Sequence, residues 1–274
     1  MDRNAGYERS REEPLGMAWT VGAVRRPAFT VDAGTHEQLR RAGWVVCALC
    51  SLQTYFVVAA AIPTHRAVTL SSSIDRLIPL VPVWAYVYGA IYSVAVVPVF
   101  IARDLRVLRR IALGFIGINL IAALVFLGFP TRMERPPLIG LPAGSFTQWT
   151  MGLIYALDPP VNCFPSLHVA NAFYVWSLGR SFDRRAGHWL FALACLIATS
   201  TLLVKQHYLL DVTTGVFLGC VAGRLATPRG GWPEHIELPA RSQWLWIPGC
   251  YAVHLMIAIA AYSGGWRPVQ VWVR

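Results

Sequence analysis

Long apolar stretches separated by short polar segments run along most of this chain. A helix needs about 20 residues to cross the hydrocarbon core of a bilayer. Seven stretches reach or approach that length, the fourth and fifth being short: 43–62, 78–102, 111–129, 167–180, 188–204, 207–226 and 244–264. The pattern predicts an all-α fold, a polytopic membrane helix bundle with six core transmembrane helices and a seventh at the C-terminus.

The composition favours the same fold class. Of the 274 residues, 55% are hydrophobic and 14% are charged, whereas about a quarter of an average soluble domain is charged. Too little polar chain remains for a separate soluble domain, which excludes a soluble enzyme. The six cysteines are scattered, and the close pair Cys47 and Cys50 lies in an apolar stretch, so we expect free thiols.

Basic residues are divided unequally between the two sides of the predicted bundle. Seven arginines precede residue 43, and together with the second, fourth and sixth loops they place 17 of the 24 lysines and arginines on one side. Because basic residues are retained in the cytoplasm, we expect a multi-pass protein of the plasma (inner) membrane with a cytoplasmic N-terminus. Membrane topology then explains the net positive charge, and we expect no nucleic acid partner.

Three regions follow from this topology. Residues 1–42 form a cytoplasmic basic arm that lacks the apolar core of a signal peptide. Residues 43–226 form the membrane domain that carries the candidate catalytic residues. Residues 227–274 form a cytoplasmic loop plus the extra transmembrane helix. The Pro- and Gly-rich connection 130–166 then faces outside, and its stretch 146–157 predicts a short interfacial helix.

Asp211 is the one acidic residue, of 14, that falls inside a predicted span. An ionisable group in a membrane helix is costly and indicates a functional site with a partner. His207 lies four residues earlier, on the same face of the predicted helix, where the carboxylate can orient the imidazole as a base or nucleophile. The alternative is a His–Asp pair that only helps a polar helix end to sit in the interface.

A second polar cluster, NCFPSLH at residues 162–168, opens the fourth span. Pro165 disfavours helix at the residue before it and Ser166 is a good N-cap, so a helix should begin there. The free N–H groups and the dipole of that helix end suit a phosphate, with His168 in the first turn beside it. An ordinary capped helix with an interfacial histidine would explain the same residues.

Lys205, the only lysine, lies two residues before His207. The arginine distribution places it at the same outer boundary as Ser166 and His168. Two histidines, a carboxylate, a cation and a helix N-terminus beside lipid suit phosphoryl transfer from a lipid phosphate. A zinc site built from His168, His207 and Asp211 is the competing interpretation, because these side chains also bind metal.

Two segments at this point resemble a known family. FPSLHVA (164–170) and KQHYLLDV (205–212) are similar to the second and third signatures of the type 2 phosphatidic acid phosphatase superfamily. Within it they most resemble the branch that contains inositol phosphorylceramide synthases and sphingomyelin synthases. The resemblance covers roughly residues 75–225, and the two signatures are separated by one helical hairpin, as in that family.

The resemblance implies a role for each candidate site residue. In that superfamily the histidine matching His207 takes up the phosphoryl group, the aspartate matching Asp211 supports it, and the histidine matching His168 protonates the leaving group. The family needs no metal, and we expect no cofactor. The implied substrate is a lipid phosphate or phospholipid in the bilayer, and the acceptor is either water or an alcohol.

The chain also departs from the superfamily pattern. Leu167 stands where the phosphatases usually have glycine, and Ser200-Thr201 stands where they have Ser-Arg. The similar Lys-Gln-His segment of the synthase-like branch implies that Lys205 supplies the missing charge. The first signature is half present, with Arg135-Pro136 but Gly128 at its lysine position. The candidate phosphate-binding residues are therefore Lys205, Ser166, Arg135 and Arg132.

We therefore expect a membrane enzyme that cleaves lipid phosphoesters on the outer face through a phosphohistidine. It would act as a lipid phosphate phosphatase or as an inositol phosphorylceramide synthase-like phosphotransferase. The rival is a non-catalytic membrane scaffold or a transporter, but transport favours related halves and polar residues near mid-bilayer, and neither is visible. The glycines at 215, 219 and 223 predict close helix packing in the sixth span.

Overall fold

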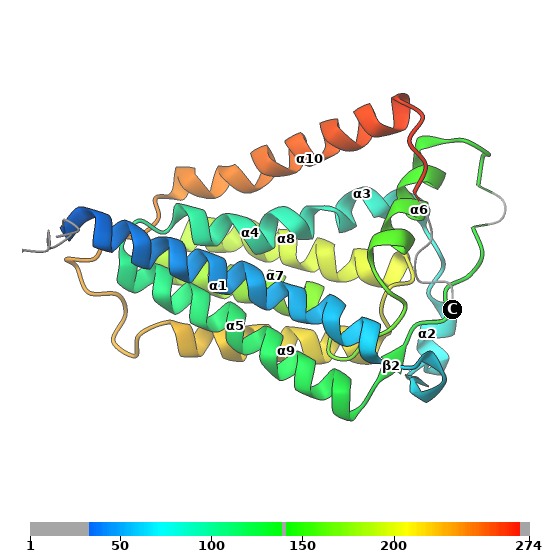
Figure 1. Ribbon diagram of the computed structural model, residues 1–274, viewed down its shortest axis with the longest axis horizontal. Helices are drawn as coiled ribbons and strands as arrows, with labels where there is room; N and C mark the ends of the chain where they lie inside the picture. The colour runs from blue at the N-terminus through cyan, green and yellow to red at the C-terminus, as the bar shows by residue number, and fades with distance from the viewer. Residues whose placement is uncertain (1–32, 139–140, 269–274) are drawn as a thin grey trace, which may run out of the picture.

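The computed structural model describes residues 33–138 and 141–268, which form a bundle of long helices (Figure 1). The long segments are α1 (Ala33–Ala61), α3 (Ala85–Tyr88) with α4 (Ala90–Ile101), α5 (Leu105–Gly128), α7 (Leu167–Phe182), α8 (Arg184–Leu203), α9 (Leu209–Ala226) and α10 (Trp246–Ser263). Within the described residues six of these segments are long and apolar enough to span a membrane, and α7, with 16 residues, is shorter. The predicted all-α polytopic bundle is confirmed.

Short elements lie in the connections between these helices. The helix predicted at 146–157 is present as α6 (Phe146–Leu157). Two strands pair in parallel, with Val68 opposite Thr131. The remaining short elements are η1 (Thr64–Arg66), β1 (Val68–Thr69), α2 (Ser73–Leu77), η2 (Pro82–Trp84), β2 (Thr131–Arg132) and η3 (Arg241–Leu245).

Several helices begin earlier than the predicted spans because polar residues cap them. The side chain of Asp104 accepts a first-turn N–H of α5 at 2.7 Å, and that of Asp183 does the same for α8 at 2.7 Å. Arg184 and Arg185, which we expected in a loop, are therefore in the first turn of α8. Helix α1 begins at Ala33, within the expected basic arm. The rest of that arm lies outside the described residues.

Helix α7 lies inside the bundle, where α8 and α9 pack along it and α4 and α5 also contact it. The α9 glycines face α7: a Cβ on Gly215 would lie 2.6 Å from the carbonyl oxygen of Ser166, and one on Gly219 would lie 2.3 Å from that of Ala170. Any larger residue would push the two helices apart. The close packing predicted from the glycine spacing is confirmed.

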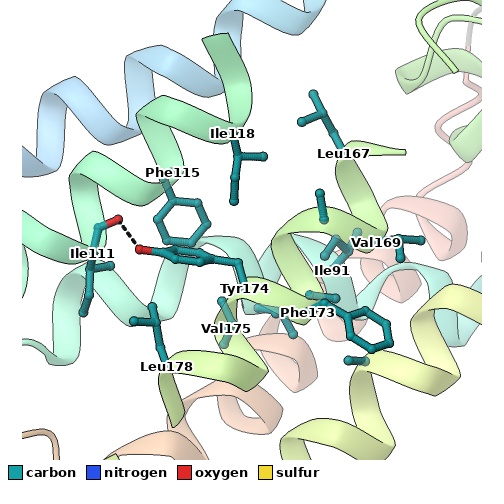
Figure 2. Close-up of a cluster of buried hydrophobic side chains, with 14 of the residues drawn as sticks. Ile91, Ile111, Phe115, Ile118, Leu167, Val169, Phe173, Tyr174, Val175 and Leu178 are labelled. Atoms are coloured by element: carbon teal, nitrogen blue, oxygen red, sulfur yellow. Dashed lines mark hydrogen bonds between the residues drawn. The ribbon is translucent and has the colours of Figure 1, made fainter. Parts of the chain in front are cut away.

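Figure 2 shows how α7 contacts α5 around Tyr174. Tyr174 is fully buried, and its hydroxyl donates to the carbonyl oxygen of Ile111 at 2.9 Å. Its ring meets Phe115 edge-on, with centroids 5.0 Å apart. A Cβ on Gly114 would overlap the tyrosine hydroxyl. Because Gly114 has no side chain, the Tyr174 hydroxyl can reach the carbonyl oxygen of Ile111, and it is hydrogen-bonded in a region without water.

The helices run alternately up and down, so each connection between them lies at one of the two ends of the bundle (Figure 1). One end, here called the motif end, holds the connections 62–84, 129–166 and 204–208. The opposite end holds the start of α1 and the connections around 102–104, 183 and 227–240, where most arginines gather. The two sequence motifs therefore meet at the end away from the arginine-rich segments, while the orientation in a membrane stays a prediction.

Candidate active site

The start of α7 is bonded directly to the start of α9. Ser166 is the N-cap of α7, as predicted, and its hydroxyl accepts the Val169 N–H at 3.4 Å. Its own N–H donates to the carbonyl oxygen of Asp211 at 3.0 Å. Because the glycine contacts hold the same two helices together, His168 in the first turn of α7 lies beside the residues that precede α9.

The residues between α8 and α9 form a tight loop. The carbonyl oxygen of Thr201 accepts the N–H groups of Gln206, at 2.9 Å, and His207, at 3.2 Å. Lys205 has a φ of 54°, in the left-handed region that favours glycine. A non-glycine residue held there costs of order 1 kcal/mol or more, which the surrounding contacts must offset. The loop that carries His207 is therefore held in one defined shape.

The expected helical face shared by His207 and Asp211 is wrong. Helix α9 begins at Leu209, because the Tyr208 N–H is bonded to the Asp211 carboxylate at 2.8 Å and the chain turns there. The two side chains still meet, since Asp211 lies in the first turn and reaches back toward the loop. His207 Nδ1 is 3.5 Å from Asp211 Oδ2, and both side chains are buried.

The pair leaves one imidazole nitrogen for chemistry. In the described part of the chain, His207 Nδ1 and Asp211 Oδ1 have no hydrogen-bond partner. A carboxylate beside Nδ1 favours the tautomer that carries its proton on that atom. The other ring nitrogen, Nε2, then has a free lone pair. This arrangement is suited to a nucleophile or a base.

The structure brings the two predicted histidines together. The ring centroids of His168 and His207 are 5.7 Å apart and the ring planes are tilted by 58°. The two rings reach this position from different segments, one from the start of α7 and the other from the loop before α9. Both imidazoles can therefore contact one small group, such as a phosphoryl group, at the motif end.

Sequence reasoning missed a second carboxylate in the site. Asp158 follows α6 and is 3% exposed. Its Oδ2 accepts the hydroxyls of Tyr88 at 2.7 Å and Tyr92 at 3.1 Å, and lies 3.8 Å from Nε2 of His168. Asp158 lies in the connection 130–166, outside the predicted spans, where an acidic residue is unremarkable. The two tyrosines, four residues apart in the second span, were the available signal.

Tyr88 connects this carboxylate to the imidazole. Its hydroxyl is also 2.8 Å from Nε2 of His168. A hydroxyl carries a single proton, so when Tyr88 donates to the Asp158 carboxylate, Nε2 of His168 must be the donor to Tyr88. His168 thus carries a proton on that nitrogen, with a buried negative charge close by.

Arg135 joins the end of α6 to the loop that carries His207. Its guanidinium donates to the carbonyl oxygens of Tyr155 at 3.2 Å and Asp158 at 2.9 Å, and to the side chain of Gln206, which precedes His207. It lies 4.6 Å from the centre of the Tyr155 ring. Burial raises the pKa of Tyr155 to about 12, and the charge of Arg135 opposes that rise. The arginine therefore places a cation between Asp158, the carboxylate near His168, and the loop that carries His207.

The other two predicted cations lie differently. Arg132 is exposed, and its backbone pairs with Thr69 in the small sheet. Lys205 Nζ donates to the carbonyl oxygens of Asp75, at 3.3 Å, and Ile78. Burial lowers the pKa of Lys205, and the Asp75 carboxylate opposes that change. Two of the three ammonium N–H groups thus point to the connection between α1 and α3.

The positions that depart from the superfamily pattern supply no charge to the site. The hydroxyls of Ser200 and Thr201 donate to α8 carbonyl oxygens one turn back, at 2.6 and 2.7 Å. Leu167 is buried in the core between the helices. Arg135 is therefore the predicted phosphate-binding cation with direct bonds to the residues around the histidines.

A cavity of about 290 Å³ leads to this site between α1, α4, α5 and α7. Its walls are mainly apolar, with Leu52, Phe56 and Val96 among them. His168 and Asp158 line it as well, so the apolar space reaches the polar cluster. An apolar cavity that reaches a few polar side chains is typical of a ligand site.

In the described residues, no group of three or more His, Cys, Asp or Glu side chains is placed so that it could hold a metal ion, as the zinc interpretation requires. His168 and His207 instead face different carboxylates, Asp158 and Asp211. All six cysteines are free, as expected from their scattered positions.

Comparison with known proteins defines the class. A sequence model of the PAP2 superfamily matches residues 60–225, and this chain belongs to that superfamily. An uncharacterized protein of Methanocaldococcus jannaschii is 30% identical over 126 residues, which are 44% of this chain and 48% of that protein. The chain thus spans about half the length of this relative. No solved structure matches. Membership in the superfamily supports a lipid phosphatase-type enzyme.

Proposed function

We propose that this protein cleaves lipid phosphoesters at the motif end of the bundle by transferring the phosphoryl group to His207. One observation carries the proposal: two imidazoles lie 5.7 Å apart and each is close to its own buried carboxylate. The apolar cavity that reaches His168 supports a lipid substrate. A scaffold or transporter would have no need of this paired arrangement.

In the first step, Nε2 of His207 attacks phosphorus and the bond from phosphorus to the lipid oxygen breaks. The leaving oxygen takes a proton from His168, which is the general acid. Asp211 stabilises the positive charge that develops on His207 as the new P–N bond forms. Asp158 and Tyr88 orient the ring of His168, because the Tyr88 hydroxyl joins its Nε2 to the Asp158 carboxylate.

In the second step an acceptor hydroxyl attacks the phosphohistidine. The P–N bond breaks, His207 regains its lone pair, and the acceptor proton passes to His168. Water as the acceptor gives a lipid phosphate phosphatase, and an alcohol gives a phosphotransferase. The similarity of the FPSLH and KQH segments to the inositol phosphorylceramide synthase and sphingomyelin synthase branch supports transfer, and water is available at a membrane surface.

Charge stabilisation in both steps comes from fixed groups. Phosphoryl transfer depends mostly on positioning and on stabilising the phosphoryl oxygens. The N-terminus of α7 at Ser166 presents backbone N–H groups, and the Arg135 guanidinium is bonded to the Asp158 carbonyl oxygen and to the side chain of Gln206, next to His207. We propose these as the main phosphate contacts. Arg132 is a further candidate, whereas the Lys205 ammonium points to the carbonyl oxygens of Asp75 and Ile78.

The test is to incubate purified protein with radiolabelled lipid phosphates, with and without candidate alcohols, and to identify the labelled product. Rapid quenching should yield acid-labile label on His207. Release of inorganic phosphate alone indicates a phosphatase, and label in the alcohol indicates a transferase. If no acid-labile label appears while product forms, the covalent mechanism is wrong.

We also propose that the motif end faces outside. The gathering of arginines at the opposite end supports this orientation. A cysteine at exposed Ala143, near α6, should react with a membrane-impermeant maleimide in intact cells, whereas one at Gly230 should react only after permeabilisation. The reverse result would invert the topology.

A further inference from the structure

The connection between α1 and α3 crosses the motif end and contacts the loop that carries His207. Its residues 72–81, here called segment 72–81, contain α2 and lead into η2. The Val81 N–H donates to the carbonyl oxygen of Leu203, the last residue of α8, at 2.8 Å. The segment is thus joined to the chain just before the 204–208 loop.

Asp75 also joins segment 72–81 to the chain that follows His207. One carboxylate oxygen, Oδ2, belongs to the capping box of α2 and accepts the Ser72 N–H at 2.8 Å. The other oxygen, Oδ1, accepts the Leu209 N–H at 2.8 Å. Leu209 is the first residue of α9, so one buried carboxylate caps the N-termini of two helices.

Lys205 completes the arrangement from the loop itself. Its ammonium donates to the carbonyl oxygens of Asp75 and Ile78, at the end of α2. The bonds of Lys205 and Leu209 to segment 72–81 therefore stand two residues before and two residues after His207. Since Lys205 also has a left-handed backbone, the loop needs such external bonds to keep its shape.

We propose that Asp75 and Lys205 are positioning residues that hold the His207 loop against segment 72–81. The proposal rests on the proposed role of His207 and gives Lys205 a different role from a phosphate ligand. Its ammonium holds the loop through carbonyl oxygens, and the phosphate contacts are left to Ser166 and Arg135. Neither Asp75 nor Lys205 contacts the substrate; they act through the position of the imidazole.

The structural part can be tested without turnover. In full-length protein that carries His207→Gln, amide hydrogen exchange should be measured over residues 205–212. Asp75→Asn and Lys205→Met should each speed exchange at Leu209 to Asp211 by roughly tenfold, because the loop opens more often. Arg76→Met changes an exposed basic residue of α2 and is the matched control, with no change expected. Unchanged exchange in both test variants would overturn the proposal.

The kinetic part uses the active protein with a lipid phosphate. Both variants should lower kcat by roughly 10- to 100-fold, the cost of a slightly misplaced group, with KM nearly unchanged. The double variant should lose little more than either single variant, because both release the same loop. Lys205→Arg should restore most of the activity, since the carbonyl acceptors need only donors.

A phosphate ligand would behave differently. If Lys205→Met raises KM while Asp75→Asn is harmless, Lys205 binds the phosphate and the positioning role is wrong. If exchange changes as expected but the unmodified protein turns over no lipid phosphate, the proposed function fails and the contact between the two segments stands. The two failures are therefore distinguishable.

Discussion

The two histidines of the site are held in different ways. His207 has its carboxylate four residues along the chain, and the distance from its Nδ1 to Asp211 is 3.5 Å. His168 has its carboxylate ten residues earlier, beyond a proline-containing turn, and reaches it partly through Tyr88 from another helix. The first pair is local and the second is assembled by packing. A local pair is visible as a motif, whereas an assembled pair requires the fold.

The largest expected effect is on the local pair. His207→Ala should abolish turnover and covalent labelling, because it removes the proposed nucleophile. Asp211→Asn should slow turnover by roughly two to four orders of magnitude, since it loses the orienting charge. Labelling after rapid quench and steady-state rates measure both. Substantial activity in His207→Ala would remove the distinction between the two histidines.

The next largest effect is expected for His168→Ala and distinguishes the general acid from the nucleophile. His168→Ala should lower turnover of a natural lipid phosphate by about 10²- to 10⁴-fold, because an alkoxide leaving group needs a general acid. A good leaving group such as p-nitrophenolate needs less help, so the loss on p-nitrophenyl phosphate should be much smaller. His207→Ala should lose both activities alike. Equal losses on the two esters for His168→Ala would argue for a binding role instead.

The assembled carboxylate should give a smaller effect of the same kind. Asp158→Asn removes the charge that favours protonated His168, so we expect roughly a tenfold loss on the lipid phosphate and little loss on the activated ester. Tyr88→Phe should resemble it, because the phenylalanine breaks the bridge to Nε2. The alkaline limb of the pH–rate profile, which should move to lower pH when the general acid loses this charge, separates this effect from misfolding. An identical loss on both esters would show that Asp158 is only structural.

The smallest effect concerns stability outside the spans. Burial acts to raise the pKa of Asp75, but hydrogen bonds from Ser72 and the Leu209 N–H, with the charge of Lys205, outweigh it and hold that pKa below its usual value. A lowered folded-state pKa stabilises the protein above the unfolded pKa, and the stabilisation is lost as the pH falls through the folded pKa.

Asp75→Asn should therefore lower the free energy of unfolding by about 1 kcal/mol at pH 7, a typical value for a lost helix cap. Its difference from the unsubstituted protein should shrink as the pH falls below about 4. Thermal unfolding in detergent at several pH values measures this. A difference that does not change with pH would assign the loss to packing and not to the carboxylate charge.

Some of this architecture was determined by the sequence alone. The apolar stretches predicted the bundle, because a membrane helix must satisfy its backbone internally and needs about 20 residues. Glycines at 215, 219 and 223 predicted close packing of the sixth span, because their spacing places them on one helical face, and the structure shows that α7 is the helix they contact. Ser166 was predicted as an N-cap from the chemistry of a short polar residue after a proline.

Other features were decided only by the tertiary structure. Asp158, Tyr88 and His168 come from three segments, and no spacing along the chain brings them together. The bonds of Lys205 to the carbonyl oxygens of segment 72–81 depend on a connection more than 120 residues away. The physical reason is the range of the interactions. Helix periods and caps act within a few residues, whereas a buried hydrogen bond between distant segments exists only after the helices have packed.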